Sequence, residues 1–305
     1  MTRGASRLLP VCVRHLLPLS PSPDQPLVSA PTPPSAPGGS ELAGCRLIFC
    51  INSGRSGSRY LTELFRTARD VKSFHEAKPN MSGEPLRLIN ALPLEASREV
   101  RRVKLCAIAD SLRGMLPHEV YAETNHMFIK TFFDVVLAEF SNVDVVILRR
   151  SLPHVLKSFI ELGYYSPLNP TAWQWMSSPN AATAALRALA PDDRLDQYDA
   201  AIAYLLDIEA RAQRFVRDYP SVRTHETRLE ELLDRDGVAA FFQRLNLVPT
   251  ARTWEFAGQM VNDRSHKKRQ FNNRTTLDEC RRRLHDYVAR AEKAGIVIPR
   301  TATFE

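Results

Sequence analysis

The stretch INSGRSGSRYLTELF, Ile51–Phe65, joins the end of an apolar run to the start of a helical pattern through a short segment of glycine and serine. Small residues let the backbone turn tightly with its N–H groups exposed, and a helix that begins there adds the positive end of its dipole. Strand–loop–helix units of this kind cradle phosphate groups. The stretch therefore predicts an anion-binding loop early in an α/β domain.

Short β-rich runs alternate with longer helical patterns after Cys45, which is typical of βαβ units around a parallel sheet. The expected strands cover residues 45–52, 71–76, 120–125, 143–150 and 221–227. The expected helices cover residues 58–68, 127–140, 152–163 and 197–219, with an amphipathic stretch at 94–116 and a terminal helical pair within 228–247.

Residues 1–43 are rich in proline, serine and alanine, so they cannot bury enough apolar surface to offset the entropy of ordering. We predict a disordered tail over 1–43 and one folded domain over 44–305. Three arginines precede the first acidic residue, Asp24, which would suit an organelle transit peptide. A wrongly assigned start codon explains the same composition equally well.

The formal net charge of +7 indicates an anionic partner, such as a nucleotide cofactor, a sulfated or acidic substrate, or nucleic acid. No aromatic RNA-binding signature, zinc-finger spacing or basic heptad supports nucleic acid. The five cysteines form no CxxC pair, so they favour reduced thiols in the cytoplasm over a zinc site or a disulfide set. No run reaches the roughly 18 apolar residues that a membrane span needs.

A second candidate anion site follows the strand VDVVILRR, residues 143–150. Nucleoside triphosphatases end a later strand in an acid that holds magnesium, and they carry a G-x-x-x-x-G-K-[ST] loop, whereas this strand ends in two arginines and that loop is absent. Ser158 follows Arg150 by eight positions and could help it to grip a phosphate. The two sites together predict a ligand with phosphates at both ends.

These two motifs, in this order, resemble those of the sulfotransferases that use 3′-phosphoadenosine 5′-phosphosulfate (PAPS). NSGRSGS, residues 52–58, resembles the family's 5′-phosphosulfate loop, and RRSLPHVLKS, residues 149–158, resembles its 3′-phosphate motif. The similarity spans roughly Arg46 to Leu247, because HETRLEELLDRDGVAAFFQRLNL, residues 225–247, also looks like a family segment. In motif the chain is closest to the carbohydrate, tyrosylprotein and bacterial branches.

The resemblance implies a three-layer, P-loop-like α/β fold with a central, mostly parallel sheet flanked by helices, and transfer of a sulfuryl group to a hydroxyl or amine without a metal. Arg55, in place of the lysine of many members, would stabilise the charge that grows on the departing phosphate oxygen. The residues implied in PAPS binding are Ser53, Gly54, Arg55, Ser56, Gly57, Ser58, Arg59, Arg150 and Ser158. A basic segment near the C-terminus could add Arg264, Lys267 and Lys268 to the 3′-phosphate site, although a solvent-exposed basic turn is the default interpretation of that segment.

Transfer to a hydroxyl needs a base within reach of the acceptor. Glu76 is the first candidate, because a catalytic glutamate of the tyrosylprotein branch lies at a similar distance after the loop. His126 is the second candidate, because cytosolic members place a catalytic histidine near this position, and His75 is the third. Glu123 could be the charged partner of either of the first two or help to close the site.

The acceptor stays open among a small molecule, a carbohydrate and a peptide, because pocket shape rather than a short motif selects it. The aromatic residues of GYYSPLNPTAWQW, 163–175, could stack on a sugar or phenol or could pack in the core. Two other functions fit the same loop, namely a metal-dependent kinase that takes ATP and a non-catalytic nucleotide-binding module of the same fold.

Overall fold

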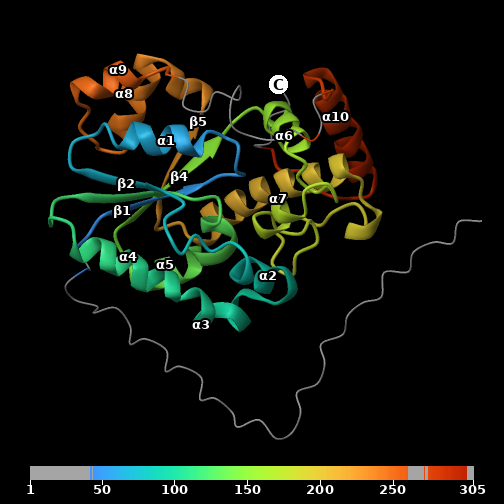
Figure 1. Cartoon of the computed structure of the whole chain (residues 1–305), viewed down its shortest axis with the longest axis horizontal. Coiled ribbons are helices and arrows are strands. Elements are labelled where there is room, and N and C mark those ends of the chain that lie inside the picture. The colour runs from blue at the N-terminus through green and yellow to red at the C-terminus, as the bar shows by residue number, and fades with distance from the viewer. Residues whose placement is uncertain (1–41, 43, 260–270, 272–273, 301–305) are drawn as a thin grey trace, which may run out of the picture. The chain divides into compact units, whose positions relative to one another are not determined.

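The computed structural model describes residues 42, 44–259, 271 and 274–300. A parallel sheet lies at the centre of the folded domain, between layers of helices (Figure 1). Its order is β2-β3-β1-β4-β5, and all neighbouring strands in this described sheet run parallel. The strands are β1 Leu47–Ile51, β2 Val71–His75, β3 Val120–Thr124, β4 Val143–Arg149 and β5 Arg223–Arg228. Every expected strand is confirmed, with ends shifted by one or two residues.

The strand order places the loop after β1 at the middle of the row formed by the carboxyl ends of the strands. The chain leaves β1 for β2 and β3 on one side, and then crosses to β4 and β5 on the other side. In parallel sheets ligands bind at such a switch point, beyond the carboxyl ends of the strands. The loop after β1 therefore lies between the segments that follow β3 and β4.

Helices cover both faces of the sheet, so the expected α/β class is confirmed (Figure 1). Alternate side chains of a strand point to opposite faces, and in β1 Phe49 packs into one buried cluster whereas Ile48 and Cys50 pack into the other. The face of Ile48 is covered by α1 Ser58–Phe65 and α8 Arg235–Arg244, and the face of Phe49 by α4 Val103–Arg113, α5 Phe133–Glu139 and α7 Gln197–Asp218.

Helical segments between β2 and β4 differ most from expectation. The amphipathic stretch 94–116 forms three short helical segments, η1 Leu94–Ser97, α3 Arg98–Arg101 and α4. The expected helix at 127–140 begins with a π-helical turn, η2 Phe128–Phe132, and continues as α5. The helix α2 Glu84–Ala91 was not predicted, because only Leu86 and Ile89 of its eight residues are buried and so leave no clear helical period.

The expected pair within 228–247 forms η5 Glu230–Leu233 and α8, but it does not end the fold. Two helices follow, α9 Ala251–Phe256 and α10 Leu277–Lys293. The buried side chains of α10, Cys280, Leu284, Tyr287 and Ala291, recur at helical spacing and join the same cluster as α6 Leu152–Glu161 and α7. None of the helices in the described ranges has the length and apolar character to cross a bilayer.

Candidate active site

The loop after β1 turns through three residues with left-handed backbone. Gly54, Arg55 and Gly57 have φ values of 77°, 58° and 98°, and the Asn52 side-chain oxygen accepts a hydrogen bond from the Gly54 N–H at 2.9 Å. The φ of Gly57 is one that residues with a side chain rarely adopt, and a Cβ added there would lie 2.6 Å from Leu229 Cδ1, so the Leu229 side chain would have to move. The tight turn expected from the sequence is present.

The N-terminus of α1 faces the same cavity as this loop. Gly57, its N-cap residue, provides no side chain to cap the helix, and the first turn carries no acidic residue. The orphan N–H groups and the positive end of the helix dipole are therefore not neutralised by the helix itself. A bound anion would supply that negative charge, so this end of α1 fits a phosphate or sulfate group.

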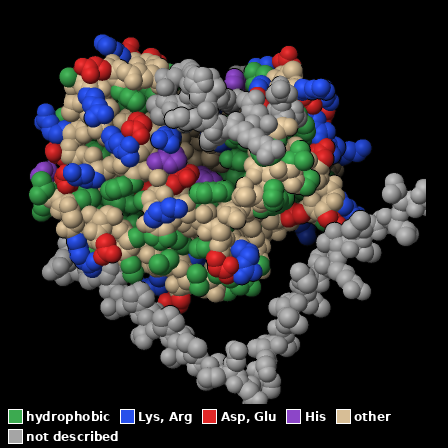
Figure 2. All heavy atoms as spheres, in the orientation of Figure 1, with side chains coloured by type: hydrophobic (Ala, Val, Ile, Leu, Met, Phe, Trp, Pro, Cys, Tyr) green, Lys and Arg blue, Asp and Glu red, His purple; other side chains and the backbone are tan. Residues whose placement is uncertain are grey.

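The loop and α1 line a cavity of about 960 Å³, close to the upper end of the range for small-molecule sites, about 300–1,000 Å³. On the β4–β5 side its wall includes Arg150, Lys157 and Leu229, and on the β2–β3 side it includes Glu76 and His126. Figure 2 shows histidine, acidic and basic side chains gathered around a hollow in the middle of this face.

The two sequence motifs meet at this cavity. Arg55 Nε donates a hydrogen bond to Ser158 Oγ at 3.1 Å, and Arg150 Nη1 donates to the backbone oxygen of Arg55 at 3.2 Å. Arg55 and Arg150 both line the cavity. The residues expected to hold a 5′-phosphosulfate and a 3′-phosphate therefore lie within one crevice.

Not every predicted binding residue lies on the wall. Gly54, Arg55, Gly57, Ser58 and Arg59 line the cavity, whereas Ser53, Ser56 and Ser158 are not among the residues that do. The backbone oxygen of Ser53 accepts a hydrogen bond from Tyr204 at 2.9 Å, and the buried Ser56 Oγ has no hydrogen-bond partner among the described residues. Arg264, Lys267 and Lys268 lie outside the described residues.

The two arginines that end β4 have different surroundings. Arg149 is held by Glu209 and Glu226, each at 2.8 Å, and does not line the main cavity. Arg150 does line it, because successive side chains along an extended segment point to opposite sides. Only the second arginine is therefore placed to contact a ligand there.

Two cavity residues on α6 were missed by the sequence analysis. His154 and Lys157 follow Arg150 by four and seven positions and, like it, line the cavity. His154 Nδ1 lies 3.0 Å from Ser151 Oγ, and Lys157 pairs with Glu161. His154 and Lys157 are three positions apart on α6 and so share one helical face, which was the signal that could have identified them.

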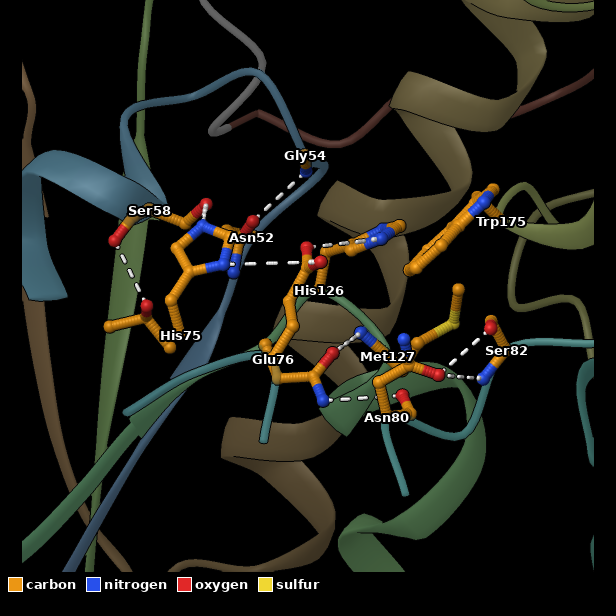
Figure 3. Close-up of polar contacts among 12 residues, drawn as sticks. Asn52, Gly54, Ser58, His75, Glu76, Asn80, Ser82, His126, Met127 and Trp175 are labelled. Atoms are coloured by element: carbon orange, nitrogen blue, oxygen red, sulfur yellow. Dashed lines mark hydrogen bonds and ion pairs between the residues drawn. The ribbon is translucent and has the colours of Figure 1, made fainter. Parts of the chain in front are cut away.

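Glu76 lies between two histidines, as Figure 3 shows. Its two carboxylate oxygens lie 3.6 Å from His126 Nε2 and 3.9 Å from His75 Nδ1. The Glu76 N–H continues the pairing of β2 by donating to the Thr124 oxygen at 3.2 Å, and its φ of 50° turns the chain out of the strand. Both candidate histidines therefore adjoin the first candidate base.

Both imidazoles are uncharged at neutral pH. Burial, reinforced by the charge of Arg59, lowers the pKa of His75 to about 4. Burial, reinforced by the charge of Lys130, holds the pKa of His126 well below its usual value of 6.5. Desolvation disfavours the charged form of a histidine, so neither imidazole brings a positive charge to the Glu76 carboxyl group.

Glu123 does not line the cavity. Its side chain is fully buried and contacts Lys104 Nζ at 2.8 Å and the Tyr121 hydroxyl at 2.7 Å. Glu123 therefore neither pairs with Glu76 or His126 nor closes the site. It forms a buried ion pair with Lys104 of α4 instead, which is a structural role. The sequence showed a charged residue within a strand, but it did not indicate the partner of this residue, because Lys104 lies 19 positions earlier in the chain.

The aromatic segment divides between the cavity wall and the core. Tyr164 and Trp175 line the cavity, and the Trp175 ring lies nearly parallel to the His126 ring, with centroids 6.3 Å apart (Figure 3). Tyr165 is instead buried, with its hydroxyl donating to the Ser177 oxygen at 2.7 Å, and Trp173 is 45% exposed.

No protein-family model matches this chain, and no curated protein matches it. Among solved structures it is similar to the sulfotransferase domain from the curacin biosynthetic pathway, with a TM-score of 0.45 and 14% identity over 84% of this chain and 99% of that chain. It is also similar to sulfotransferase STF1 from Mycobacterium tuberculosis H37Rv, with a TM-score of 0.43 and 12% identity over 79% of this chain and 77% of that chain. A sulfotransferase from Alicyclobacillus acidocaldarius gives a TM-score of 0.42 and 12% identity over 81% of this chain and 94% of that chain.

Proposed function

We propose that this protein is a sulfotransferase that moves a sulfuryl group from PAPS to a hydroxyl or amine acceptor. The observation that carries the proposal is the contact between the two anion sites, where Arg55 donates to Ser158 and Arg150 donates to the backbone of Arg55. A nucleotide with phosphate groups on both its 5′ and 3′ sides matches two cationic sites that share one cavity.

The residues on the cavity wall divide into two groups for this ligand. Gly54, Arg55 and Gly57 with the N-terminus of α1 would hold the 5′-phosphosulfate, because backbone N–H groups and a guanidinium meet its charge there. Arg150 would hold the 3′-phosphate together with Ser158, which is buried behind the wall against Arg55, and Lys157 adds a cation to the same wall.

PAPS, when bound, supplies the sulfuryl group on an anhydride bond to its 5′-phosphate. In the proposed displacement, a bond forms between the acceptor oxygen or nitrogen and sulfur, and the bond from sulfur to the phosphate oxygen breaks. Arg55 and the end of α1 stabilise the negative charge that collects on the leaving phosphate. Glu76 accepts the acceptor's proton, because it is the anionic group between two uncharged imidazoles.

A thermal-shift measurement tests the proposal without knowledge of the acceptor, because a ligand that binds only the folded state raises the melting temperature. Adenosine 3′,5′-bisphosphate should raise the melting temperature, and the shift should grow with ligand concentration. AMP, which lacks the 3′-phosphate, is the matched ligand control and should give a smaller shift.

The alternative functions give different results in the same assay. A shift with ATP and magnesium but none with the bisphosphate would overturn the sulfotransferase and favour a kinase. A shift with the bisphosphate, combined with no release of bisphosphate from PAPS across a panel of phenols, alcohols, sugars and amines, would favour a binding module without catalysis.

A further inference from the structure

Lys130 is a fully buried lysine beside the candidate active site, and nothing in the proposed chemistry uses it. It lies in the π-helical turn Phe128–Phe132 that follows β3. Its Nζ contacts His126 Nδ1 at 3.0 Å, the backbone oxygen of Trp175 at 3.0 Å and the hydroxyl of Tyr204 at 3.2 Å. Turns of this wider type are frequent at functional sites.

The three contacts differ in which atom donates. The Trp175 backbone oxygen can only accept, and the Tyr204 hydroxyl donates its own hydrogen to Ser53, so toward Lys130 it also accepts. Lys130 therefore donates to both. The third contact depends on its charge, because an ammonium donates to His126 Nδ1 whereas a neutral amine accepts from it.

The opposite side of the His126 ring distinguishes these two arrangements. His126 Nε2 faces a carboxylate oxygen of Glu76 at 3.6 Å. If Lys130 is an ammonium, Nδ1 accepts and the hydrogen of the neutral ring lies on Nε2, directed at the carboxylate. If Lys130 is a neutral amine, the Nε2 lone pair faces the carboxylate, and two acceptors oppose one another.

The charges around Lys130 act in both directions. Burial lowers the pKa of Lys130 well below 10.5, and the charge of Arg211 adds to this, whereas the carboxylates of Glu76 and Asp207 raise it. An ammonium with three acceptors around it also meets the requirement that a buried charge be hydrogen-bonded. The hydrogen-bond geometry and the two carboxylates favour the charged form.

We propose that Lys130 is a positioning residue that holds His126 as its Nε2–H tautomer, so that His126 donates toward Glu76 and leaves Glu76 as the only base of the pair. The assignment of the tautomer stands on the contacts of Lys130 and His126, and its catalytic consequence rests on the proposed sulfuryl transfer. The same ammonium connects the loop after β1, through Tyr204, with the segment at Trp175 that lines the cavity.

Nitrogen-15 NMR of the whole protein, labelled at the histidine rings, tests the tautomer directly, because protonated and unprotonated ring nitrogens resonate far apart. We expect the wild-type His126 to carry its hydrogen on Nε2 at neutral pH. Lys130→Met removes the donor to Nδ1 at nearly constant volume and should raise the share of the Nδ1–H form of His126.

Lys104→Met is the matched control. Lys104 is also fully buried, and its Nζ donates to Glu123 and to the Ala77 oxygen, each at 2.8 Å, without touching His126. It should lower stability and leave the His126 tautomer unchanged. A wild-type Nδ1–H tautomer would overturn the proposal, as would a Lys130→Met spectrum in which the share of the Nε2–H form equals that of the wild type.

A second variant covers the case in which Lys130→Met does not fold. Lys130→Gln keeps an amide donor but loses the charge, and it should leave a mixture of tautomers, whereas a pure Nε2–H form in this variant would contradict a role for the ammonium. If the protein is active, either variant should lower kcat roughly 10- to 100-fold with little change in nucleotide affinity. The NMR result stands whether or not sulfuryl transfer is found, so the two proposals can fail separately.

Discussion

Arg150 donates a hydrogen bond, at 3.2 Å, to the backbone oxygen of Arg55, although 95 positions separate the two residues. Arg55 in turn donates to Ser158 on the first turns of α6. These contacts place the cationic residue of the first loop against the cationic residue that follows β4. Had the two arginines faced opposite sides of the sheet, no single nucleotide could have contacted both.

Loss of the Arg150 guanidinium should selectively weaken binding of the bisphosphate. We expect Arg150→Met to raise the Kd for adenosine 3′,5′-bisphosphate by roughly 10- to 100-fold, because a charge-assisted hydrogen bond contributes about 1.5–3 kcal/mol. Isothermal titration of each variant with the bisphosphate and with AMP measures the effect. The loss should be much smaller for AMP.

Arg149→Met is the control for this prediction. Arg149 neighbours Arg150 but is held by Glu209 and Glu226 away from the cavity. Its loss should lower the melting temperature of the free protein and leave the bisphosphate Kd close to that of the wild type. Equal losses of affinity in the two variants would argue against a specific phosphate contact by Arg150.

A side chain at Gly57 should strain the loop after β1. Its φ of 98° and the 2.6 Å approach of a Cβ to Leu229 Cδ1 predict that Gly57→Ala destabilises the fold by about 1–3 kcal/mol and weakens nucleotide binding, because the backbone is strained and the Leu229 side chain must move at the cavity wall. Denaturant unfolding and titration with the bisphosphate measure the two effects. Gly295→Ala shares the positive φ, at 77°, but no atom lies within 4 Å of its Cβ. It should lower stability alone, and a loss of affinity there would contradict this interpretation.

Replacement of Glu76 should separate catalysis from binding. Glu76→Gln keeps the shape of the side chain and removes the proton acceptor, so turnover should fall roughly 10²- to 10⁴-fold. The melting-temperature shift with the bisphosphate should be retained. Turnover is followed as release of bisphosphate from PAPS with an acceptor found in the panel.

Glu63→Gln is the matched control for the charge change, because Glu63 lies on α1 and pairs with Arg66 outside the cavity wall. We expect wild-type turnover in this variant. Undiminished turnover of Glu76→Gln would instead assign the base elsewhere.

The two histidines beside Glu76, His126 buried and His75 partly buried, should make stability fall in mild acid. In the unfolded chain both imidazoles bind protons near pH 6.5, whereas in the fold the pKa of His75 is lowered to about 4 and that of His126 lies well below 6.5, in both cases mainly through burial. Between about pH 6.5 and 4 the unfolded state therefore binds more protons, and the free energy of unfolding must decrease as the pH falls.

Urea unfolding at several pH values checks this slope. His75→Asn and His126→Asn should each flatten the slope between pH 6.5 and 4, and the double variant should flatten it further. His118→Asn is the control for the loss of an imidazole, because the His118 side chain is 61% accessible. A wild-type slope in the double variant would show that other groups cause the acid sensitivity.

Much of the fold could be predicted from local patterns. The helices α1, α6 and α7 each place an apolar face in one of the two clusters, and β1 and residues 145–148 of β4 are apolar throughout because they bury side chains in both clusters. The helix α2 buries only two residues, and the π-helical turn at 128–132 departs from the helical period. These elements depend on tertiary packing and gave no clear signal.

The sequence by itself determined which chemistry the chain carries: a glycine–serine turn between a strand and a helix, an arginine and a serine eight positions apart, and a glutamate after the second strand. Local backbone preference and residue type are enough for those features. Only the tertiary structure decided which neighbours point inward, so that Arg150 reaches the cavity and Arg149 does not, and Glu123 is paired beneath the sheet with Lys104. It alone also brought Lys130 against His126 in the interior, because the direction and partners of a side chain are set by contacts with residues distant in sequence.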